Sequence, residues 1–109
     1  MNGARKGAAG ERELTYKLQE FGFDAVRNYQ RDIGGYDNPD IQIPGMHVEC
    51  KRTECLRLHD AVAQATADAK GRIPVVMSRR NREKWLVTMY LDDWAGLYKA
   101  FVEKGDSPQ

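Results

Sequence analysis

The sequence predicts a single α/β domain in which helices flank a central mixed sheet of five strands, in the order αβββαββα. Its 109 residues are 41% hydrophobic, which suffices for one core but not for two. Segments with helical periodicity alternate with short strand-like runs, and glycine or proline separates them. This alternation favours a mixed sheet flanked by helices. We expect residues 1–4 and 105–109 to be frayed tails.

The composition excludes several classes of protein. Seventeen Lys and Arg residues against 16 Asp and Glu give a formal net charge of +1, which excludes a histone-like binder and an acidic disordered domain. A membrane helix needs about 20 apolar residues in a row and a signal peptide about 7–15, whereas the longest apolar run here has three. We therefore expect an intracellular protein with no membrane contact, cytoplasmic or inside the host cell if it is viral.

The first helix is predicted over Arg5 to Phe21. Leu14, Leu18 and Phe21 recur at helical spacing and form a buried stripe, and Gly22 ends the run. The same spacing places Glu11 on the buried stripe.

Three strands and a loop follow this helix. The sequence predicts a short strand at 24–28, a loop at 29–38 with a glycine pair, a second strand at 40–43 and a third at 46–52. Pro44 and Gly45 make a turn, so the second and third strands form a hairpin.

The second half repeats the alternation. An alanine-rich helix is predicted over 58–70, a fourth strand over 73–78, a basic turn over 79–83 and a fifth strand over 84–90.

Asp92 or Asp93 is predicted to cap a last helix. Its apolar face consists of Trp94, Leu97, Tyr98 and Phe101. Such a face either packs on the sheet of its own chain or forms a dimer interface.

The hairpin carries the strongest chemical signal. Glu49 and Lys51 are two residues apart on one strand and therefore share a face, while Val48 and Cys50 take the other. Asp40, on the paired strand, faces the same side as Glu49. Two carboxylates this close need a cation between them, and oxygen ligands of this kind suit Mg²⁺. The alternative is an exposed strand face with a cross-strand salt bridge.

Glu11 adds to this signal, because a carboxylate on a buried stripe needs a partner. A metal or a positioned water in the same site would provide one; the alternative is a first-turn glutamate favoured by the helix dipole. By the same helical phase, Glu13 lies on the exposed face and pairs with Lys17.

A zinc site is also conceivable, since two histidines and two cysteines lie close together in the sequence. Such a site would need all four to converge. On a strand, however, His47 and Cys50 point to opposite faces, which disfavours a cluster of His47, Cys50, Cys55 and His59.

Four segments of the chain carry a family resemblance: residues 5–14 (RKGAAGEREL), 22–27 (GFDAVR), 39–41 (PDI) and 49–51 (ECK). In these segments, and over roughly residues 5–90, the chain resembles the archaeal-type Holliday-junction resolvases of the PD-(D/E)xK nuclease superfamily. The resemblance implies a restriction-endonuclease-like domain. The first two segments are the more specific ones, because many nucleases share the other two.

The resemblance also implies roles for matching residues. Glu11 corresponds to the acid on the first helix that contributes to the metal site. Asp40 and Glu49 correspond to the metal-binding carboxylates, with the backbone carbonyl of Cys50 as a further ligand. Lys51 corresponds to the catalytic lysine.

Three further residues correspond to positions near DNA or near the site. Arg12 and Arg27 correspond to DNA-facing arginines, and Gln64 to a polar residue that related nucleases often place near the site. The resolvases usually carry a serine in the loop before Pro39, and residues 29–38 contain none.

A local basic patch fits a polyanionic partner. Residues 70–84 contain six basic side chains and one acid, and positive charge beside a carboxylate site draws phosphates toward it. We expect Arg79, Arg80 and Arg82 to contact DNA; the alternative is an ordinary solvated turn.

Together these observations predict an endonuclease that depends on Mg²⁺, with Mn²⁺ as the alternative ion, and that cuts DNA at four-way junctions. A junction needs paired cuts, so we expect a homodimer. Two alternatives remain: a related nuclease acting on duplex, nicked or flapped DNA, and a DNA-binding module without catalysis.

Overall fold

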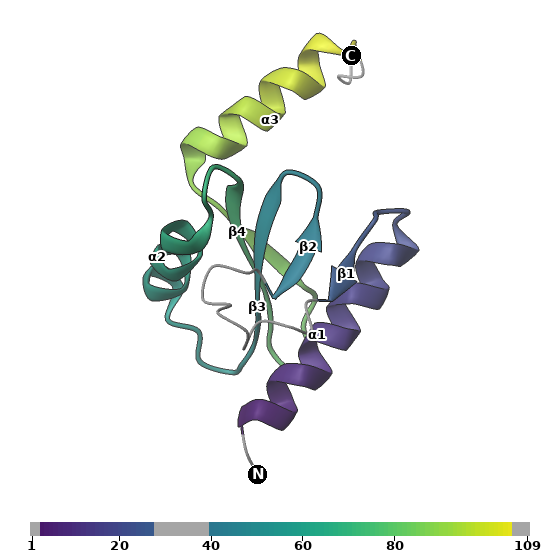
Figure 1. The fold of residues 1–109 in the computed structure, drawn as a ribbon, viewed down its shortest axis with the longest axis vertical. Helices are drawn as coiled ribbons and strands as arrows, with labels where there is room; N and C mark the ends of the chain where they lie inside the picture. Colours follow the sequence, from purple (N-terminus) through teal and green to yellow (C-terminus); the bar gives the residue numbers. More distant parts are fainter. Residues whose placement is uncertain (1–2, 28–39, 106–109) are drawn as a thin grey trace.

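Three helices and a five-stranded sheet make up the computed structural model of this chain, which describes residues 3–27 and 40–105 (Figure 1). The predicted order αβββαββα is confirmed. The loop predicted at 29–38 and the outermost residues of both tails lie outside the described residues. The elements are α1 (Gly3–Glu20), β1 (Val26–Arg27), β2 (Ile41–Ile43), β3 (Met46–Arg52), α2 (Leu58–Asp68), β4 (Ile73–Arg79), β5 (Leu86–Thr88) and α3 (Leu91–Glu103).

The sheet is mixed, as predicted, and its strands lie in chain order from β1 to β5. β3 and β4 run parallel and are joined by α2, while the other neighbouring strands are antiparallel. Val48 in β3 lies beside Ile41 on one side and Val75 on the other. The hairpin between β2 and β3 turns at Gly45, whose φ of +83° is one that glycine adopts without strain.

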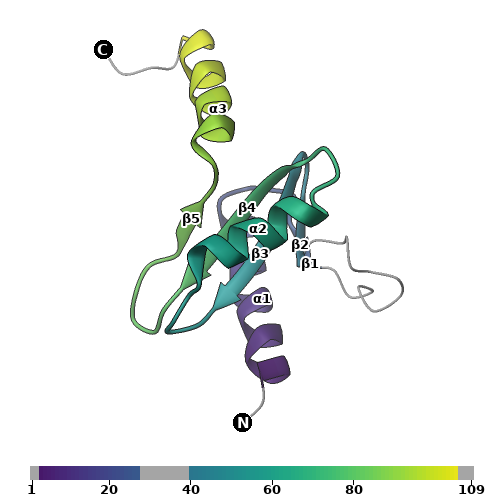
Figure 2. The same cartoon turned by 90° about the vertical axis from the view of Figure 1, so that its left-hand side faces the viewer.

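Helices α1 and α2 cover opposite faces of the sheet (Figure 2). Because side chains alternate along a strand, neighbours such as Val75 and Val76 enter different cores. The α1 side holds the larger core, formed by Leu14, Leu18, Ala25, Ile41, Val48, Val75 and Met77. The α2 side holds a smaller one, formed by Ala61, Val62, Ala65 and Val76.

The end of α1 differs from the prediction. Gly22 does end the helix, with a φ of +92°, and the Phe23 amide donates to the Leu18 carbonyl at 3.1 Å, as in a Schellman cap. This turn swings Phe21 out of the buried stripe, so its predicted burial is wrong. Phe21 is 62% exposed and lies beside the ring of Phe23.

The start of α3 also differs. Tyr90 is the N-cap, in an extended conformation, and its carbonyl accepts the amides of Asp93 and Trp94. Asp92 and Asp93 lie in the first turn instead, where their charge still favours the positive end of the helix dipole. The prediction that one of them caps the helix is therefore wrong.

The two edge strands are shorter than predicted. β1 has two residues and β5 has three, and each pairs with a neighbour on one side only. Helix α3 follows β5 and projects away from the sheet (Figures 1 and 2). None of its side chains is buried, so its apolar face does not close the core of its own chain. Among the described helices, none is long and apolar enough to span a bilayer.

Candidate active site

Asp40 is held against the middle of β3. Its amide donates to the Val48 carbonyl at 3.1 Å, so the residue extends the ladder that β2 makes with β3. Its carboxylate oxygen Oδ2 accepts the amide of Cys50 at 2.8 Å. Side chain and backbone together therefore fix the Asp40 carboxylate beside Glu49 and Cys50.

The backbone of Cys50 faces this same edge of β3. In a strand, residues two apart direct their N–H and C=O groups to the same neighbour. Val48 bonds to Asp40 through its carbonyl and Cys50 bonds to Asp40 through its amide. The Cys50 carbonyl therefore points toward the side of the strand where the Asp40 carboxylate lies.

Glu49 is buried, with 4% of its surface exposed. Its carboxyl has a pKa raised from 4.5 to about 8, mainly because of burial and also because of the neighbouring Asp40 carboxylate, whose effect is larger than the opposite effect of Lys51. A buried carboxyl beside a second carboxylate, with its pKa raised in this way, holds either a proton or a cation.

Lys51 lies on the same face, toward α2. Its Nζ is 3.4 Å from the Oε1 of Gln64, a residue of α2. The structure thus brings together Asp40, Glu49 and Lys51, as the period of two along β3 indicated, and adds Gln64 from α2, as the resemblance implied.

His47 is a neighbour of the site that the sequence analysis missed. It is fully buried, its Nε2 lies 3.1 Å from the Oε1 of Glu49, and the Nη2 of Arg72 lies 3.4 Å from its Nδ1. A guanidinium can only donate, so Nδ1 accepts and Nε2 carries the proton that it donates to Glu49. The signal was present in the sequence: His47 is two residues before Glu49 and shares its face.

The conceivable zinc cluster is not assembled. Cys50 packs against the core on the α1 side, whereas His47 bonds to Glu49 on the opposite face. Instead, ligand atoms of His47, Glu49 and Asp68 lie within 4.8 Å of one another.

Glu11 is buried, as its helical phase predicted, with 4% of its surface exposed. Its Oε1 accepts from the Nε of Arg27 at 3.1 Å. The two residues were expected to act separately, and the structure pairs them. Glu11 approaches the site from the α1 side: burial, together with the Asp40 and Glu11 charges, raises the pKa of the Cys50 thiol to about 12.

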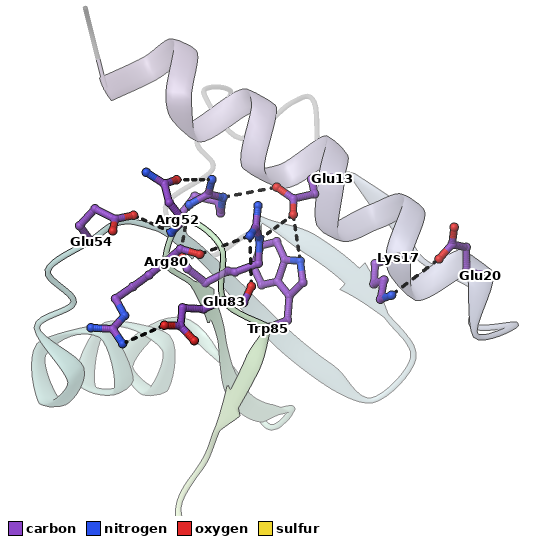
Figure 3. A network of polar contacts seen from close by, with 10 residues as sticks. Glu13, Lys17, Glu20, Arg52, Glu54, Arg80, Glu83 and Trp85 are labelled. Atoms are coloured by element: carbon purple, nitrogen blue, oxygen red, sulfur yellow. Dashed lines mark hydrogen bonds and ion pairs between the residues drawn. The ribbon is translucent and has the colours of Figure 1, made fainter.

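Glu13 does not pair with Lys17, contrary to the prediction. Lys17 reaches Glu20 instead. Glu13 accepts hydrogen bonds from Arg52 at 3.3 Å and from the indole of Trp85 at 3.2 Å (Figure 3), and it forms an ion pair with Arg79 at 2.7 Å. Here α1 lies close to Arg79 of β4. Glu13 therefore pairs with residues distant in sequence instead of with Lys17. Burial would raise the pKa of Glu13, but the two arginines outweigh it and lower the pKa below its ordinary value.

The three arginines of the basic turn differ in what they contact. Arg79 forms an ion pair with Glu13 and lies over the ring of Trp85. Arg80 is exposed and pairs with Glu83 at 3.6 Å (Figure 3). Arg82 and, on α1, Arg12 are exposed as well. Of the arginines expected to contact DNA, Arg27 and Arg79 thus have partly buried partners within the chain, whereas Arg80 has only an exposed one.

No family model matches this sequence, and no curated protein matches it. A solved structure does: that of Archaeoglobus fulgidus Hjc, a Holliday junction resolvase from an archaeal hyperthermophile. It aligns with a TM-score of 0.60 and 28% identity over 77% of this chain and 72% of that chain. The resemblance to the archaeal-type resolvases that the motifs predicted is therefore confirmed by the fold.

Proposed function

We propose that this chain is a metal-dependent endonuclease that hydrolyses DNA at four-way (Holliday) junctions. One observation carries the proposal: on a fold like that of a junction resolvase, Asp40, Glu49 and Lys51 meet at the edge of β3. Two carboxylates and a lysine in this arrangement fit metal-assisted phosphodiester hydrolysis.

The donor set fits a hard divalent cation. Asp40 and Glu49 offer carboxylate oxygens, and the Cys50 carbonyl points to the same place, which suits Mg²⁺ or Mn²⁺. Bound there, the ion would polarise the scissile phosphate and lower the pKa of a bound water. The raised pKa of Glu49 supports this assignment, because a cation relieves the repulsion that otherwise keeps a proton on the pair.

Lys51 is the residue we assign to the attacking water. Its ammonium either holds that water in line with the phosphate or neutralises charge that develops in the transition state. Gln64 positions the ammonium through its amide oxygen. On the α1 side of the strand, we assign the buried Glu11 to a metal-bound water and its partner Arg27 to a DNA phosphate.

The partner is DNA, held by exposed arginines on the same chain. Arg12, Arg80 and Arg82 are exposed and would contact phosphates. Resolving a junction takes one cut in each of two equivalent strands, and one chain has one such site. A two-fold homodimer supplies the second.

A cleavage assay tests this proposal directly. A four-way junction and a linear duplex with the same arm sequences are incubated with Mg²⁺ or with a chelator. We expect Mg²⁺-dependent cuts in the junction and few in the duplex, and Asp40→Asn and Lys51→Ala to lower the rate by about 10²–10⁴-fold. Lys104→Ala, at the far end of α3, is the control and should cleave normally.

Three outcomes would contradict the proposal in different ways. Equal cleavage of both substrates would indicate a nuclease for duplex or nicked DNA. Tight junction binding with no cleavage in Mg²⁺ or Mn²⁺ would indicate a DNA-binding module. Normal cleavage by Lys51→Ala would leave the fold assignment intact but remove the mechanism.

A further inference from the structure

Helix α3 carries an apolar face that stays about half exposed among the residues that the structure describes. Trp94, Tyr98 and Phe101 form a continuous row of rings, with 5.1 Å between the first two centroids and 6.2 Å between the next two. Leu97 lies on the same face. All four side chains are roughly half exposed, and none of the helix is buried.

An unfilled apolar groove lies on the α1 side of the sheet. It encloses about 540 Å³ between the end of α1, the β2–β3 hairpin and β5, and its lining is almost wholly apolar. Phe23, Ile43, Met46, Val87 and Met89 line it. Val87 and Phe23 are largely exposed within one chain.

These two surfaces are continuous at one point. Leu97, in the second turn of α3, also lines the groove, so groove and helix face form one apolar surface that extends off the body of the domain. The link from β5 to α3 is two residues long, and the extended backbone of Tyr90 directs the helix outward. The aromatic row itself, Trp94, Tyr98 and Phe101, does not line the groove of the same chain.

We propose that α3 is an arm that two copies of this chain exchange: the aromatic face of each α3 occupies the groove of the other copy. A helix of 13 residues is marginal in water without packing, and a large apolar surface marks an interaction site. Every copy offers one helix and one groove, so reciprocal insertion uses both and closes into a two-fold dimer. A net charge of +1 opposes this association only weakly.

The inference rests on the homodimer of the proposed function, but not on its chemistry. It specifies which surfaces meet, and it can therefore be tested without DNA or metal.

The first test measures assembly by sedimentation. Tyr98→Glu combined with Phe101→Glu, and separately Val87→Glu, should each raise the dimer dissociation constant about tenfold or more. Both changes place charge on surfaces that are exposed in the single chain, so each variant should still fold as a monomer, which circular dichroism checks. Lys99→Glu, on the opposite side of α3, is the control and should leave the dimer intact. A wild-type chain that is monomeric at micromolar concentration would overturn the proposal.

The second test separates exchange from any other dimer. In a Cys55→Ser background, one chain carries Val87→Cys and another carries Tyr98→Cys, and the two are mixed and treated with a short bismaleimide. Exchange predicts a covalent dimer in the mixture that neither chain forms alone. A crosslink found only within a chain carrying both cysteines would show that α3 folds back on its own groove.

The two proposals can fail separately. A dimer that cuts junctions but gives no crosslink in the mixture overturns the exchange and keeps the nuclease. A crosslinked dimer that never cuts DNA keeps the exchange and overturns the nuclease.

Discussion

His47 and Arg72 form a chain of hydrogen bonds that ends on the carboxylate of Glu49. Removing a group that holds a metal ligand in place typically lowers metal affinity by about 10–100-fold. We therefore expect His47→Ala to weaken Mg²⁺ binding by that factor, measured by titrating junction cleavage with metal. His47→Gln, whose amide can still donate, should recover part of the loss.

His59 provides the matched control for this prediction, because it is an exposed histidine on α2. His59→Ala should leave the metal titration unchanged. If His47→Ala lowered stability without changing the metal dependence of cleavage, His47 would be a core residue and not a positioning residue.

Glu49 and Glu13 should give the metal-free protein opposite responses to pH. The pKa of Glu49 is raised from 4.5 to about 8 in the folded chain, so the folded state keeps a proton that the unfolded state loses. The free energy of unfolding therefore falls as pH rises from 4.5 to 8. The pKa of Glu13 is lowered, so its contribution is lost only as pH falls below 4.5.

Thermal unfolding in a chelator over pH 3–9 checks both signs. In Glu49→Gln, stability should fall less than in the wild type between pH 4.5 and 8. In Glu13→Gln, stability should fall less than in the wild type only below pH 4.5. Adding Mg²⁺ should restore stability at pH 8 in the wild type but not in Glu49→Gln. If Glu13→Gln changed the pH 4.5–8 range and Glu49→Gln changed the range below pH 4.5, the result would contradict the site described above.

At the scale of the elements, local patterns predicted most of what the structure contains. β3 has the predicted bounds of 46–52, and α2 begins at Leu58 as predicted. Alternation along β3 placed Glu49 and Lys51 together because side-chain direction in a strand depends only on the neighbouring residues. Helical phase placed Glu11 inward for the same reason.

Features that depend on distant partners could not be predicted in this way. The Glu13 to Trp85 bond joins residues 72 apart in sequence, and no local rule chooses it over Lys17. Phe21 carries the right spacing for burial, but its exposure depends on where the cap turns the chain. The face of α3 has a core-like pattern, and only the path of the chain after β5 shows that its own sheet does not cover it.

The closeness of α1 to β3 leads to a prediction about two glycines. A Cβ at Gly10 would lie 2.6 Å from the Cγ of Arg52 and 2.9 Å from its Cβ, whereas one at Gly7 would meet nothing within 4 Å. Gly7→Ala should therefore stabilise the protein by up to about 1 kcal/mol through helix propensity. Gly10→Ala should destabilise it by about 1–3 kcal/mol, because helix and strand must move apart.

Urea unfolding of the two variants beside the wild type measures this difference. The displacement of Arg52 in Gly10→Ala should also weaken its bonds to Glu13 and Asn81. Equal stabilisation by both alanines would mean that α1 does not pack this closely on β3.

At the scale of the whole molecule, the near-neutral chain must bind a polyanion through a few placed charges. Arg79 forms an ion pair with Glu13 and lies over the ring of Trp85. Its replacement should therefore lower the stability of the protein more than its affinity for DNA. Arg80 and Arg82 are exposed, and Arg80 has only a surface ion pair to give up. We therefore expect these two, and not Arg79, to set the salt dependence of binding.

Junction affinity of the Asp40→Asn chain, measured by fluorescence anisotropy over a range of salt, tests this division. Each phosphate contact contributes about 0.9 to the slope of log affinity against log salt. Arg80→Ala with Arg82→Ala should lower the slope by up to twice that amount and leave the melting temperature nearly unchanged. Arg79→Ala should lower the melting temperature and keep the slope. A slope unaffected by the double change would mean that the turn is merely solvated, and that α1, through Arg12, carries the phosphate contacts.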